Sequence, residues 1–192
     1  MTEAGTWRDM AGTVAPMGAL HGWRVCPRCG APLGGDAERL ACEGCGAVYY
    51  ANSAPTVCGL VEDAAARLLL GRRAIEPYRG MWDTLGGFLH EGEDVLAGLR
   101  RELREETGLE VEPVSFLGAW TDRYGDGPEA VHTLNLFWVV RATGGEPRPA
   151  DDVEELAWFA ADELPAPEEL AFTRVADVIA AWRADVGSRR PG

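Results

Sequence analysis

The stretch Gly87–Leu109, GFLHEGEDVLAGLRRELREETGL, decides the fold and the function more than any other part of this chain. From Glu93 to Thr107 the residue types favour a helix, and Gly108 suits the left-handed backbone conformation that ends many helices. We expect Glu93 and Asp94 in the first turn, where the positive end of the helix dipole favours negative charge. The segment therefore predicts a loop followed by a helix with a defined start and end.

Three glutamates of this helix share one face. Glu102, Glu105 and Glu106 are three and four residues apart, which brings their carboxylates to the same side. A solvated acidic face paired with nearby arginines is one interpretation. However, the same face continues through Val95, Gly98 and Leu99, which indicates partial burial, and buried carboxylates without a cation are costly. Because hard oxygen ligands suit Mg²⁺ or Mn²⁺, we predict a divalent cation site here.

The glycines before the helix have a geometric role. Gly87 and Gly92 bracket a tight loop that brings the backbone close to the start of the helix. Such a loop and helix can present amides and carboxylates to a diphosphate from one rigid element.

This segment resembles the Nudix box, which reads Gly, five residues, Glu, seven residues, then Arg-Glu-aliphatic-x-Glu-Glu-x-Gly-aliphatic. All nine defined positions are matched, which makes a chance match improbable. They are Gly87, Glu93, Arg101, Glu102, Leu103, Glu105, Glu106, Gly108 and Leu109. The resemblance covers residues 55–185 and implies an α/β class fold, the Nudix α/β/α sandwich with a mixed sheet.

The family resemblance also implies a reaction, hydrolysis of the pyrophosphate bond in a nucleoside diphosphate linked to another moiety. Carried over by position, Glu102, Glu105 and Glu106 hold Mg²⁺ or Mn²⁺, and one of them or a later glutamate activates the water. Glu93 and Arg101 are implied as catalytic supporting residues that fix the loop and orient the ligands. Glu155 is a later acidic candidate, and it fits a surface charge run equally well.

Substrate-binding residues are less well defined by the sequence. Aromatic side chains such as Trp82 and Tyr124 could stack on a base, and Arg72 or Arg73 could meet a phosphate or a ribose. Each of these residues is also consistent with ordinary packing or an exposed surface. The predicted substrate-binding set is Gly87, Arg72, Arg73, Trp82 and Tyr124.

Four of the five cysteines form two Cys-x-x-Cys pairs, CPRCG at residues 26–30 and CEGCG at residues 42–46. Two short turns that face each other can bring four thiolates onto one ion, and a closed site of four cysteines has a structural role. We therefore predict a small zinc ribbon in which a structural Zn²⁺ is bound by Cys26, Cys29, Cys42 and Cys45. Disulfides and a redox pair are the disfavoured alternatives. Cys58 fits a buried packing residue.

A zinc ribbon before a Nudix domain resembles two known arrangements. One is the NADH pyrophosphatase branch, which also removes NAD-type caps from RNA and carries a Ser-Gln-Pro-Trp-Pro-Phe-Pro stretch after the box. This chain has GAWTDRYGD at residues 118–126 instead. We therefore expect the second arrangement, similar to ADP-ribose and FAD pyrophosphatases, with an ADP-ribose- or FAD-like dinucleotide preferred over NADH. NADH or NAD-cap hydrolysis and a non-catalytic nucleotide-binding regulator are the alternatives.

Composition limits the partners. The formal net charge is −13, and all 18 basic residues are arginine. Residues 1–50 hold four arginines against five acidic residues, so a nucleic-acid partner is disfavoured. No apolar run is long enough to span a membrane, and the N-terminus is a poor export signal. We expect a cytoplasmic protein with a small-molecule nucleotide substrate and no membrane partner, and the sequence leaves a homodimer open.

Three regions follow from these patterns: a flexible tail at 1–22, the zinc ribbon at 23–50 and the Nudix hydrolase domain at 51–187. Within the last region the residue pattern predicts strands and one further helix. The expected strands are 56–62, 67–72, 84–89, 114–121, 133–141 and 154–159. The expected helix is 170–186, and 122–131 is expected to be a loop.

Overall fold

The computed structural model describes residues 18–125 and 130–189. These residues form two compact units. The smaller unit contains the four cysteines, and the larger one spans residues 54–124 and 133–189 within the described part. None of the described helices is long and apolar enough to cross a membrane.

The smaller unit is a three-stranded antiparallel sheet in the order β1-β2-β3. Its strands are β1 (Leu33–Gly35), β2 (Arg39–Cys42) and β3 (Val48–Tyr50). Residues 18–22, which we assigned to the flexible tail, form hydrogen-bonded turns, and Leu20 among them is buried. Residues 1–17 of that tail lie outside the described part of the chain.

The larger unit contains a seven-stranded mixed sheet with the order β10-β5-β4-β9-β8, to which β6 and β7 add by pairing with β5 and β4. The central strand β4 pairs with β9 in parallel and with β5 and β7 in antiparallel fashion. The strands are β4 (Ala54–Glu62), β5 (Leu68–Arg73), β6 (Trp82–Asp83), β7 (Leu85–Phe88), β8 (Glu110–Tyr124), β9 (Val131–Gly144) and β10 (Val153–Phe159).

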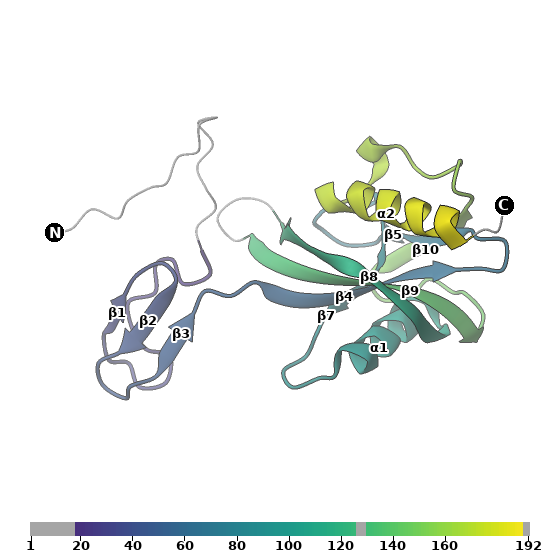
Figure 1. Ribbon diagram of the computed structural model, residues 1–192. Coiled ribbons are helices and arrows are strands. Elements are labelled where there is room, and N and C mark those ends of the chain that lie inside the picture. The colour runs from purple at the N-terminus through teal and green to yellow at the C-terminus, as the bar shows by residue number, and fades with distance from the viewer. Residues whose placement is uncertain (1–17, 126–129, 190–192) are drawn as a thin grey trace. The chain divides into compact units, whose positions relative to one another are not determined.

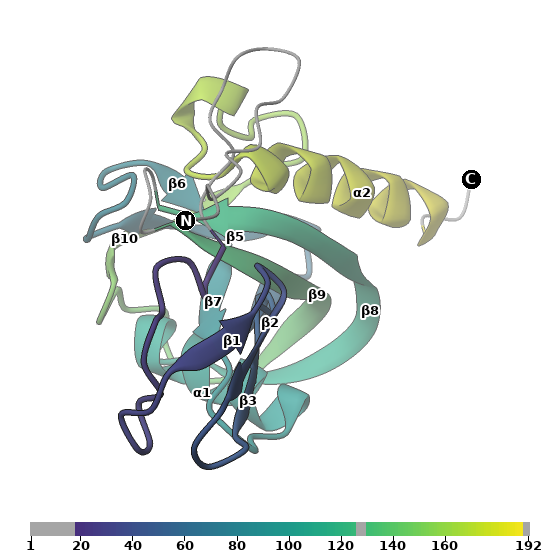
Figure 2. The same ribbon diagram turned by 90° about the vertical axis from the view of Figure 1, so that its left-hand side faces the viewer.

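Two helices cover opposite faces of this sheet, α1 (Val95–Thr107) below and α2 (Thr173–Arg189) above it in Figure 1. The view from the side shows the same three layers (Figure 2). A short 3₁₀ helix, Pro167–Glu169, precedes α2. The predicted α/β/α sandwich with a mixed sheet is confirmed.

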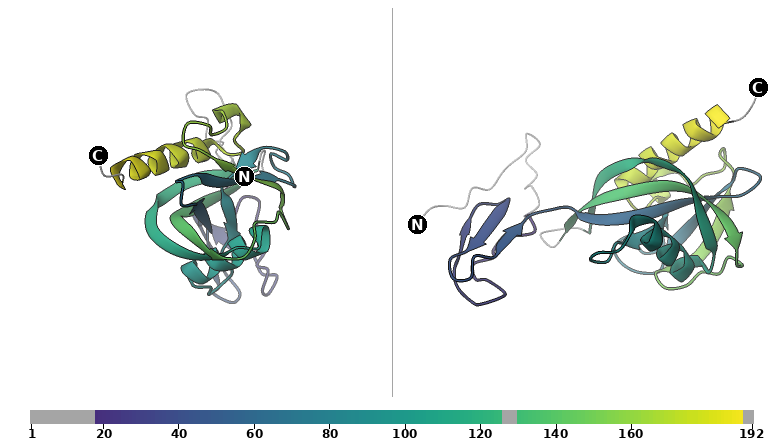
Figure 3. Two further views of the ribbon diagram at one scale, coloured as in Figure 1. Left: turned by 90° about the vertical axis from the view of Figure 1, so that its right-hand side faces the viewer. Right: turned by 60° about the horizontal axis from the view of Figure 1, so that its bottom comes forward.

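Apolar side chains that point alternately to the two faces of the central strands form two separate cores. In β4, Val57 and Val61 pack in the core on the α1 side, whereas Cys58 and Leu60 pack on the α2 side. This is the period of two expected for a strand covered on both faces. Leu99 and Leu103 of α1 complete one core. The α2 residues of the other core are Val175, Val178, Ile179, Trp182 and Val186. Figure 3 shows the sheet between the two helices.

The predicted elements are present, with shifted boundaries. α1 begins at Val95 rather than at Glu93, because the Asp94 carboxylate caps it by accepting from the amides of Leu96 and Ala97. Strand β8 continues to Tyr124, and strand β9 already begins at Val131. Both strands therefore extend into residues 122–131, which we predicted to be a loop. Residues 126–129 of that segment lie outside the described part.

Candidate active site and cysteine cluster

The loop between β7 and α1 is tied to the helix by Glu93 and Arg101. Both carboxylate oxygens of Glu93 accept from the Arg101 guanidinium at 2.8 Å, and one also accepts from the His90 amide at 3.0 Å. The hydrogen bonds from Arg101 lower the pKa of Glu93 to about 2. Arg101 also donates to the Phe88 carbonyl at 3.2 Å, which joins the end of β7 to the helix.

Arg101 contacts two of the three predicted ligands as well. Its guanidinium lies 2.7 Å from a Glu102 oxygen and 3.1 Å from a Glu105 oxygen. The two carboxylates differ in environment, because the Glu102 side chain is 13% exposed and that of Glu105 is 49% exposed. Burial raises the pKa of Glu102 even though Arg101 lies next to it.

Glu106 is the most buried of the three glutamates. Its carboxylate accepts a hydrogen bond from the Gly86 amide at 2.8 Å. Burial raises its pKa well above the usual value, and the nearby charges of Glu102, Asp83 and Asp152 add to that effect. An ionised Glu106 at neutral pH therefore needs a cation beside it, which is what a bound divalent metal supplies.

Gly86 and Gly87 of β7 are both required by close contacts. A Cβ on Gly87 would lie 2.6 Å from a Glu102 oxygen. Gly86 has a φ of 138°, and a Cβ there would lie 2.2 Å from the Val57 carbonyl oxygen. Only residues without a side chain leave room for the glutamates against β7.

The three glutamates occupy one face of α1, but they do not converge on a single point. Among the described residues, the four cysteines are the one set of three or more His, Cys, Asp or Glu close enough together to hold a metal ion. Arg101 draws Glu102 and Glu105 toward itself, whereas the Gly86 amide holds Glu106 on the strand side.

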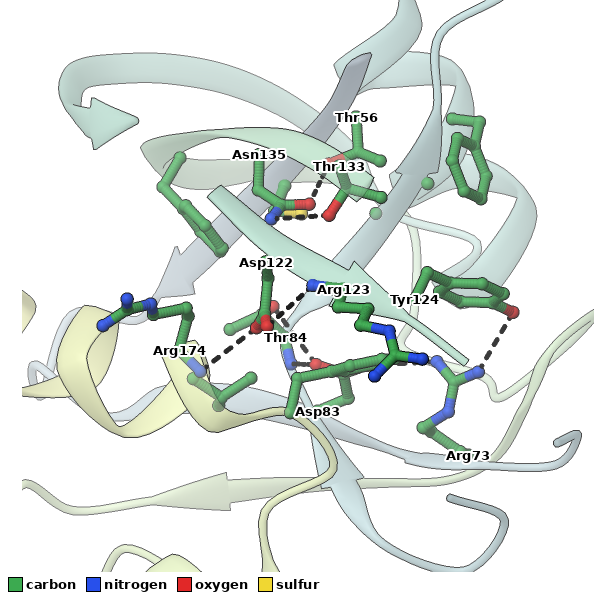
Figure 4. A pocket seen from close by; sticks show the side chains of 17 residues that line it. Thr56, Arg73, Asp83, Thr84, Asp122, Arg123, Tyr124, Thr133, Asn135 and Arg174 are labelled. Atoms are coloured by element: carbon green, nitrogen blue, oxygen red, sulfur yellow. Dashed lines mark hydrogen bonds and ion pairs between the residues drawn. The ribbon is translucent and has the colours of Figure 1, made fainter. Parts of the chain in front are cut away.

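A cavity opens next to Gly86 and Gly87 in the same unit (Figure 4). It holds about 560 Å³ of empty space, part of it open to solvent. Its walls come from β4, β5, β6, β7, β8, β9 and the start of α2. The lining residues used below are Thr56, Arg73, Asp83, Phe88, Asp122, Tyr124, Thr133, Asn135, Phe172 and Arg174.

One side of this cavity combines aromatic rings with an arginine. The Tyr124 ring stacks on Phe172 with centroids 5.7 Å apart, and it meets Phe88 edge to face at 5.5 Å. The Arg73 guanidinium lies 5.1 Å from the Phe172 ring centre and donates to the Tyr124 hydroxyl at 3.4 Å. These groups provide apolar surface and positive charge, which suit a nucleotide.

Arg73 is paired with a buried carboxylate, Asp83, at 3.1 Å. Burial raises the pKa of Asp83 to about 6, although Arg73 opposes this shift. A smaller cavity brings Asp83 together with Glu106 and Asp152. The acidic character of the site therefore extends beyond the three box glutamates.

The predicted substrate-binding residues divide into two groups. Gly87, Arg73 and Tyr124 line the cavity. Trp82 and Arg72 are not among its lining residues, and their role in substrate binding stays a prediction. Trp82 is buried against Phe159 in the α2-side core, and Arg72 stacks on Trp82 at 4.7 Å. Neighbouring residues of one strand point to opposite faces, which separates Arg72 from Arg73.

For the residues that the structure describes, no hydrogen bond or ion pair joins Glu155 to the box glutamates. It pairs with Arg72 at 3.0 Å across the β10–β5 ladder, where the two residues are register partners. Cavity residues that the sequence analysis did not name include Asp83, Thr133, Asn135, Phe172 and Arg174. Nothing in their local sequence marks them, because separate strands and the α2 start bring them together.

The sulfur atoms of the four cysteines all lie within 4.8 Å of one another. The sulfur atoms of Cys26 and Cys45 are 3.8 Å apart, and those of Cys29 and Cys42 are 3.5 Å apart. Both turns have the same backbone pattern, since the Gly30 and Gly46 amides donate to the Cys26 and Cys42 carbonyls. Both glycines adopt the left-handed conformation, with φ of 74° and 72°.

Tyr49 of β3 adds a side-chain hydrogen bond to the cysteine cluster. Its hydroxyl lies 3.2 Å from the Cys26 sulfur, and this contact lowers the pKa of Cys26 to about 6. The amides of Gly44 and Cys45 donate to the Cys42 sulfur at 3.3 and 3.4 Å. Donors aimed at sulfur favour thiolates, so this set fits a metal that binds through four thiolates. Cys58 lies apart, packed in the α2-side core.

Comparison with known families agrees with this geometry. The family model described as the NUDIX domain matches residues 52–181. The chain belongs to the Nudix family. An NAD-capped RNA hydrolase NudC of Chromobacterium violaceum is 32% identical over 151 residues, covering 76% of this chain and 53% of that protein. The chain thus spans about half the length of such curated relatives.

Two further proteins extend the comparison of this Nudix chain. An ADP-ribose pyrophosphatase of Methanocaldococcus jannaschii is 32% identical over 123 residues, covering 64% of this chain and 69% of that protein. A crystal structure of a NUDIX hydrolase from Nitrosomonas europaea superposes with a TM-score of 0.72 at 23% identity, covering 88% of this chain and 96% of the other. The names of the curated relatives favour the NADH and NAD-cap alternative over the ADP-ribose- or FAD-like substrate that we expected first.

Proposed function

We propose that this protein hydrolyses the pyrophosphate bond of dinucleotides of the NAD(H) type in a reaction that depends on a divalent metal. The observation that carries the proposal is the position of the aromatic and arginine-lined cavity beside Gly86 and Gly87, next to the buried carboxylate of Glu106. In this reaction water adds to one phosphorus and the bridging oxygen leaves with the other phosphate. NADH would give reduced nicotinamide mononucleotide and AMP.

In this proposal Glu102, Glu105 and Glu106 hold Mg²⁺ or Mn²⁺, which neutralises phosphate charge and lowers the pKa of the attacking water when bound. Glu106 is fixed by the Gly86 amide, and Arg101 with Glu93 positions Glu102 and the loop. Positioning and charge stabilisation supply most of the catalysis of phosphoryl transfer. The protein would thus act mainly by holding cations and diphosphate in one geometry.

The substrate would lie with its diphosphate at Gly86 and Gly87 and with one nucleoside in the cavity. Tyr124, Phe88 and Phe172 offer ring faces or edges to a base. Arg73 is held against this cluster by Asp83, so it presents a positioned guanidinium rather than a mobile one. Gly87 has no Cβ, so the Glu102 carboxylate can lie against the backbone beside the proposed position of the diphosphate.

For the cysteine cluster we propose one structural Zn²⁺ bound by Cys26, Cys29, Cys42 and Cys45. Four thiolate ligands close the tetrahedral site and leave no position for water. The three-stranded unit buries few apolar side chains, Leu20 and Leu40 among them, so a metal would add much of its stability.

ADP-ribose is the second candidate substrate. Residues 118–126 lack the Ser-Gln-Pro-Trp-Pro-Phe-Pro stretch of the NADH branch. The archaeal ADP-ribose pyrophosphatase is matched over more than two thirds of its own length. Because the chain carries a net charge of −13, a substrate with a long RNA chain is less favoured than a free dinucleotide.

A panel of NADH, NAD⁺, ADP-ribose, FAD and diadenosine polyphosphates, assayed with Mg²⁺ and with Mn²⁺, tests the proposal. We expect metal-dependent release of two mononucleotides, with the highest kcat/KM for NADH or NAD⁺. A tenfold higher kcat/KM for ADP-ribose, about 1.4 kcal/mol, would favour the second candidate. Absence of hydrolysis across the panel would contradict the enzyme assignment and favour a nucleotide-binding regulator.

A further inference from the structure

The floor of the cavity carries a hydrogen-bonded row of three polar side chains on β4 and β9 (Figure 4). The Thr56 hydroxyl donates to the side-chain oxygen of Asn135 at 2.5 Å. The Asn135 amide nitrogen donates to the Thr133 hydroxyl oxygen at 3.1 Å and to the Trp120 carbonyl at 3.2 Å. Thr56 and Thr133 are both buried, at 6% and 3% exposure.

The sheet register shows that this row replaces a hydrophobic core. Thr56 is the partner of Asn135 in the parallel β4–β9 ladder, and the next pair on the same face is Cys58 with Phe137. Cys58 and Phe137 belong to the α2-side core. The face thus changes from apolar to polar within the cavity, since Cys58 and Phe137 line it as well. Burying three polar groups has a cost, which a ligand that bonds to them would offset.

Two hydroxyl groups of the row, those of Thr133 and Thr56, can each form a further hydrogen bond. Asn135 uses both amide hydrogens, on Trp120 and Thr133, so its oxygen faces Thr56 and its orientation is fixed. The Thr133 hydroxyl oxygen accepts from Asn135, and in the part of the chain that the structure describes no acceptor is recorded for its hydrogen. The Thr56 hydroxyl donates its hydrogen to Asn135 and keeps an oxygen lone pair.

We propose that Thr133 and Thr56 determine specificity by binding a planar group that carries an acceptor beside an amino donor. The Thr133 hydroxyl would donate to the acceptor, and the amino group would donate to the Thr56 oxygen. A nicotinamide carboxamide has this pattern, and so does the amino edge of adenine. A carboxylate does not, because an oxygen replaces the amino donor, and a hypoxanthine edge does not, because its donor and acceptor have exchanged positions. This inference rests on the proposed dinucleotide function.

The surrounding cavity fits such a planar group. Tyr124 and Phe172 place ring surfaces in the same space, and Phe88 borders it next to Gly87. A base whose edge contacts the threonines can therefore keep its faces against aromatic or apolar walls, with its phosphates toward Gly87. Asn135 is a positioning residue here, since its amide sets the direction of both hydroxyl groups.

The test compares wild-type enzyme with Thr133→Val and Thr56→Val, which keep the shape of threonine and remove the hydroxyl. Initial rates are measured for NAD⁺, for its nicotinic acid analogue and for its hypoxanthine analogue. If the nicotinamide end occupies the row, wild type prefers NAD⁺ over the nicotinic acid analogue by tenfold or more. If the adenine end occupies the row, wild type prefers NAD⁺ over the hypoxanthine analogue by tenfold or more. In either case we expect both variants to reduce that preference to about threefold or less.

Thr143→Val is the matched control, since Thr143 is exposed on the same strand and donates to the Glu110 carbonyl at 3.2 Å. It should keep the wild-type preference. Unchanged preferences in both Thr133→Val and Thr56→Val, with hydrolysis intact, would overturn the inference and leave the proposed function standing.

If no dinucleotide is hydrolysed, binding measurements can still test the threonine row separately from the proposed hydrolysis. Calorimetric titration then uses AMP, IMP, nicotinamide mononucleotide and nicotinic acid mononucleotide as probes. A preference for AMP over IMP, or for the amide over the acid, that is lost in Thr133→Val would support the row as a binding site. Equal affinity of wild type within both pairs would overturn it, and thermal melts of the variants verify that they are folded.

Discussion

The Glu106 carboxylate accepts a hydrogen bond from the backbone amide of Gly86 at 2.8 Å, which joins the last turn of α1 to the strand that precedes the box. This contact places the buried Glu106 carboxyl group in the smaller cavity, which Asp83 and Asp152 also line. A side chain on Gly86 would collide with β4, and one on Gly87, the first residue of the box, would collide with Glu102. The proposed metal site therefore depends on two residues, Gly86 of β7 and Glu106 of α1, that lie 20 positions apart in the sequence.

Gly87→Ala should impair catalysis more than folding. The added Cβ would lie 2.6 Å from a Glu102 oxygen, and the carboxylate is the end of a flexible side chain that can move away. We expect kcat/KM to fall at least tenfold with a higher Mg²⁺ requirement and a melting temperature close to wild type. Gly187→Ala is the control, because nothing lies within 4 Å of its Cβ and alanine favours a helix. Wild-type Mg²⁺ dependence in Gly87→Ala would contradict this account of the glycine.

The pH dependence of stability should reflect Asp83. Its pKa in the folded protein is about 6, above the usual 3.8, because burial disfavours its charge. A group with a raised folded pKa binds more protons when folded, so its contribution to stability is present below about pH 4 and is lost as the pH rises through 6. Asp83→Asn removes this contribution. Denaturant titrations of metal-free protein from pH 4 to 7 should show a smaller decrease in the free energy of unfolding for the variant. An identical slope would show that Asp83 does not titrate in this range.

The cysteine cluster should bind one zinc per chain, and Tyr49→Phe should weaken it without abolishing it. The phenylalanine keeps the edge contact with Trp23 and loses the hydroxyl that lies 3.2 Å from the Cys26 sulfur. We expect zinc loss to a chelator to be several-fold faster than in wild type, and Cys42→Ser to lose the metal and stability outright. Elemental analysis and a colorimetric zinc-release assay give the readout. Protein purified under reducing conditions without zinc would refute the ribbon assignment.

The box could be found in the sequence because it depends on local spacing, and the fold class was implied by the resemblance of that box to the Nudix family. The box and the paired cysteine turns are short segments in which each residue role follows from neighbours a few positions away. The central strands followed from apolar runs such as Thr56–Glu62. Helix α1 was placed within two residues, the difference being the Asp94 cap.

The cavity was harder to predict because it is assembled from distant strands. Arg72 and Arg73 are adjacent and chemically identical, yet only Arg73 lines the cavity. The strand register decides this, and the sequence alone left the register open. Thr56 and Asn135 have ordinary strand surroundings, and their role appears only when the parallel β4–β9 ladder pairs them. Trp82, which we predicted as a base-stacking residue, packs in the α2-side core.

The central claim is that the box glutamates bind the catalytic cations, and initial rates of NADH hydrolysis against Mg²⁺ concentration test it most directly. Glu106→Gln and Glu105→Gln keep the side-chain shape and remove a charge. Glu110→Gln, in an exposed pair with Arg104, is the matched control. We predict at least a hundredfold loss of rate in the first two variants, about 2.7 kcal/mol of transition-state stabilisation, and a raised Mg²⁺ requirement. Their metal-free melting temperatures should equal or slightly exceed wild type, since repulsion between neighbouring carboxylates is relieved. Wild-type rates and Mg²⁺ dependence in both Glu105→Gln and Glu106→Gln would contradict the assignment.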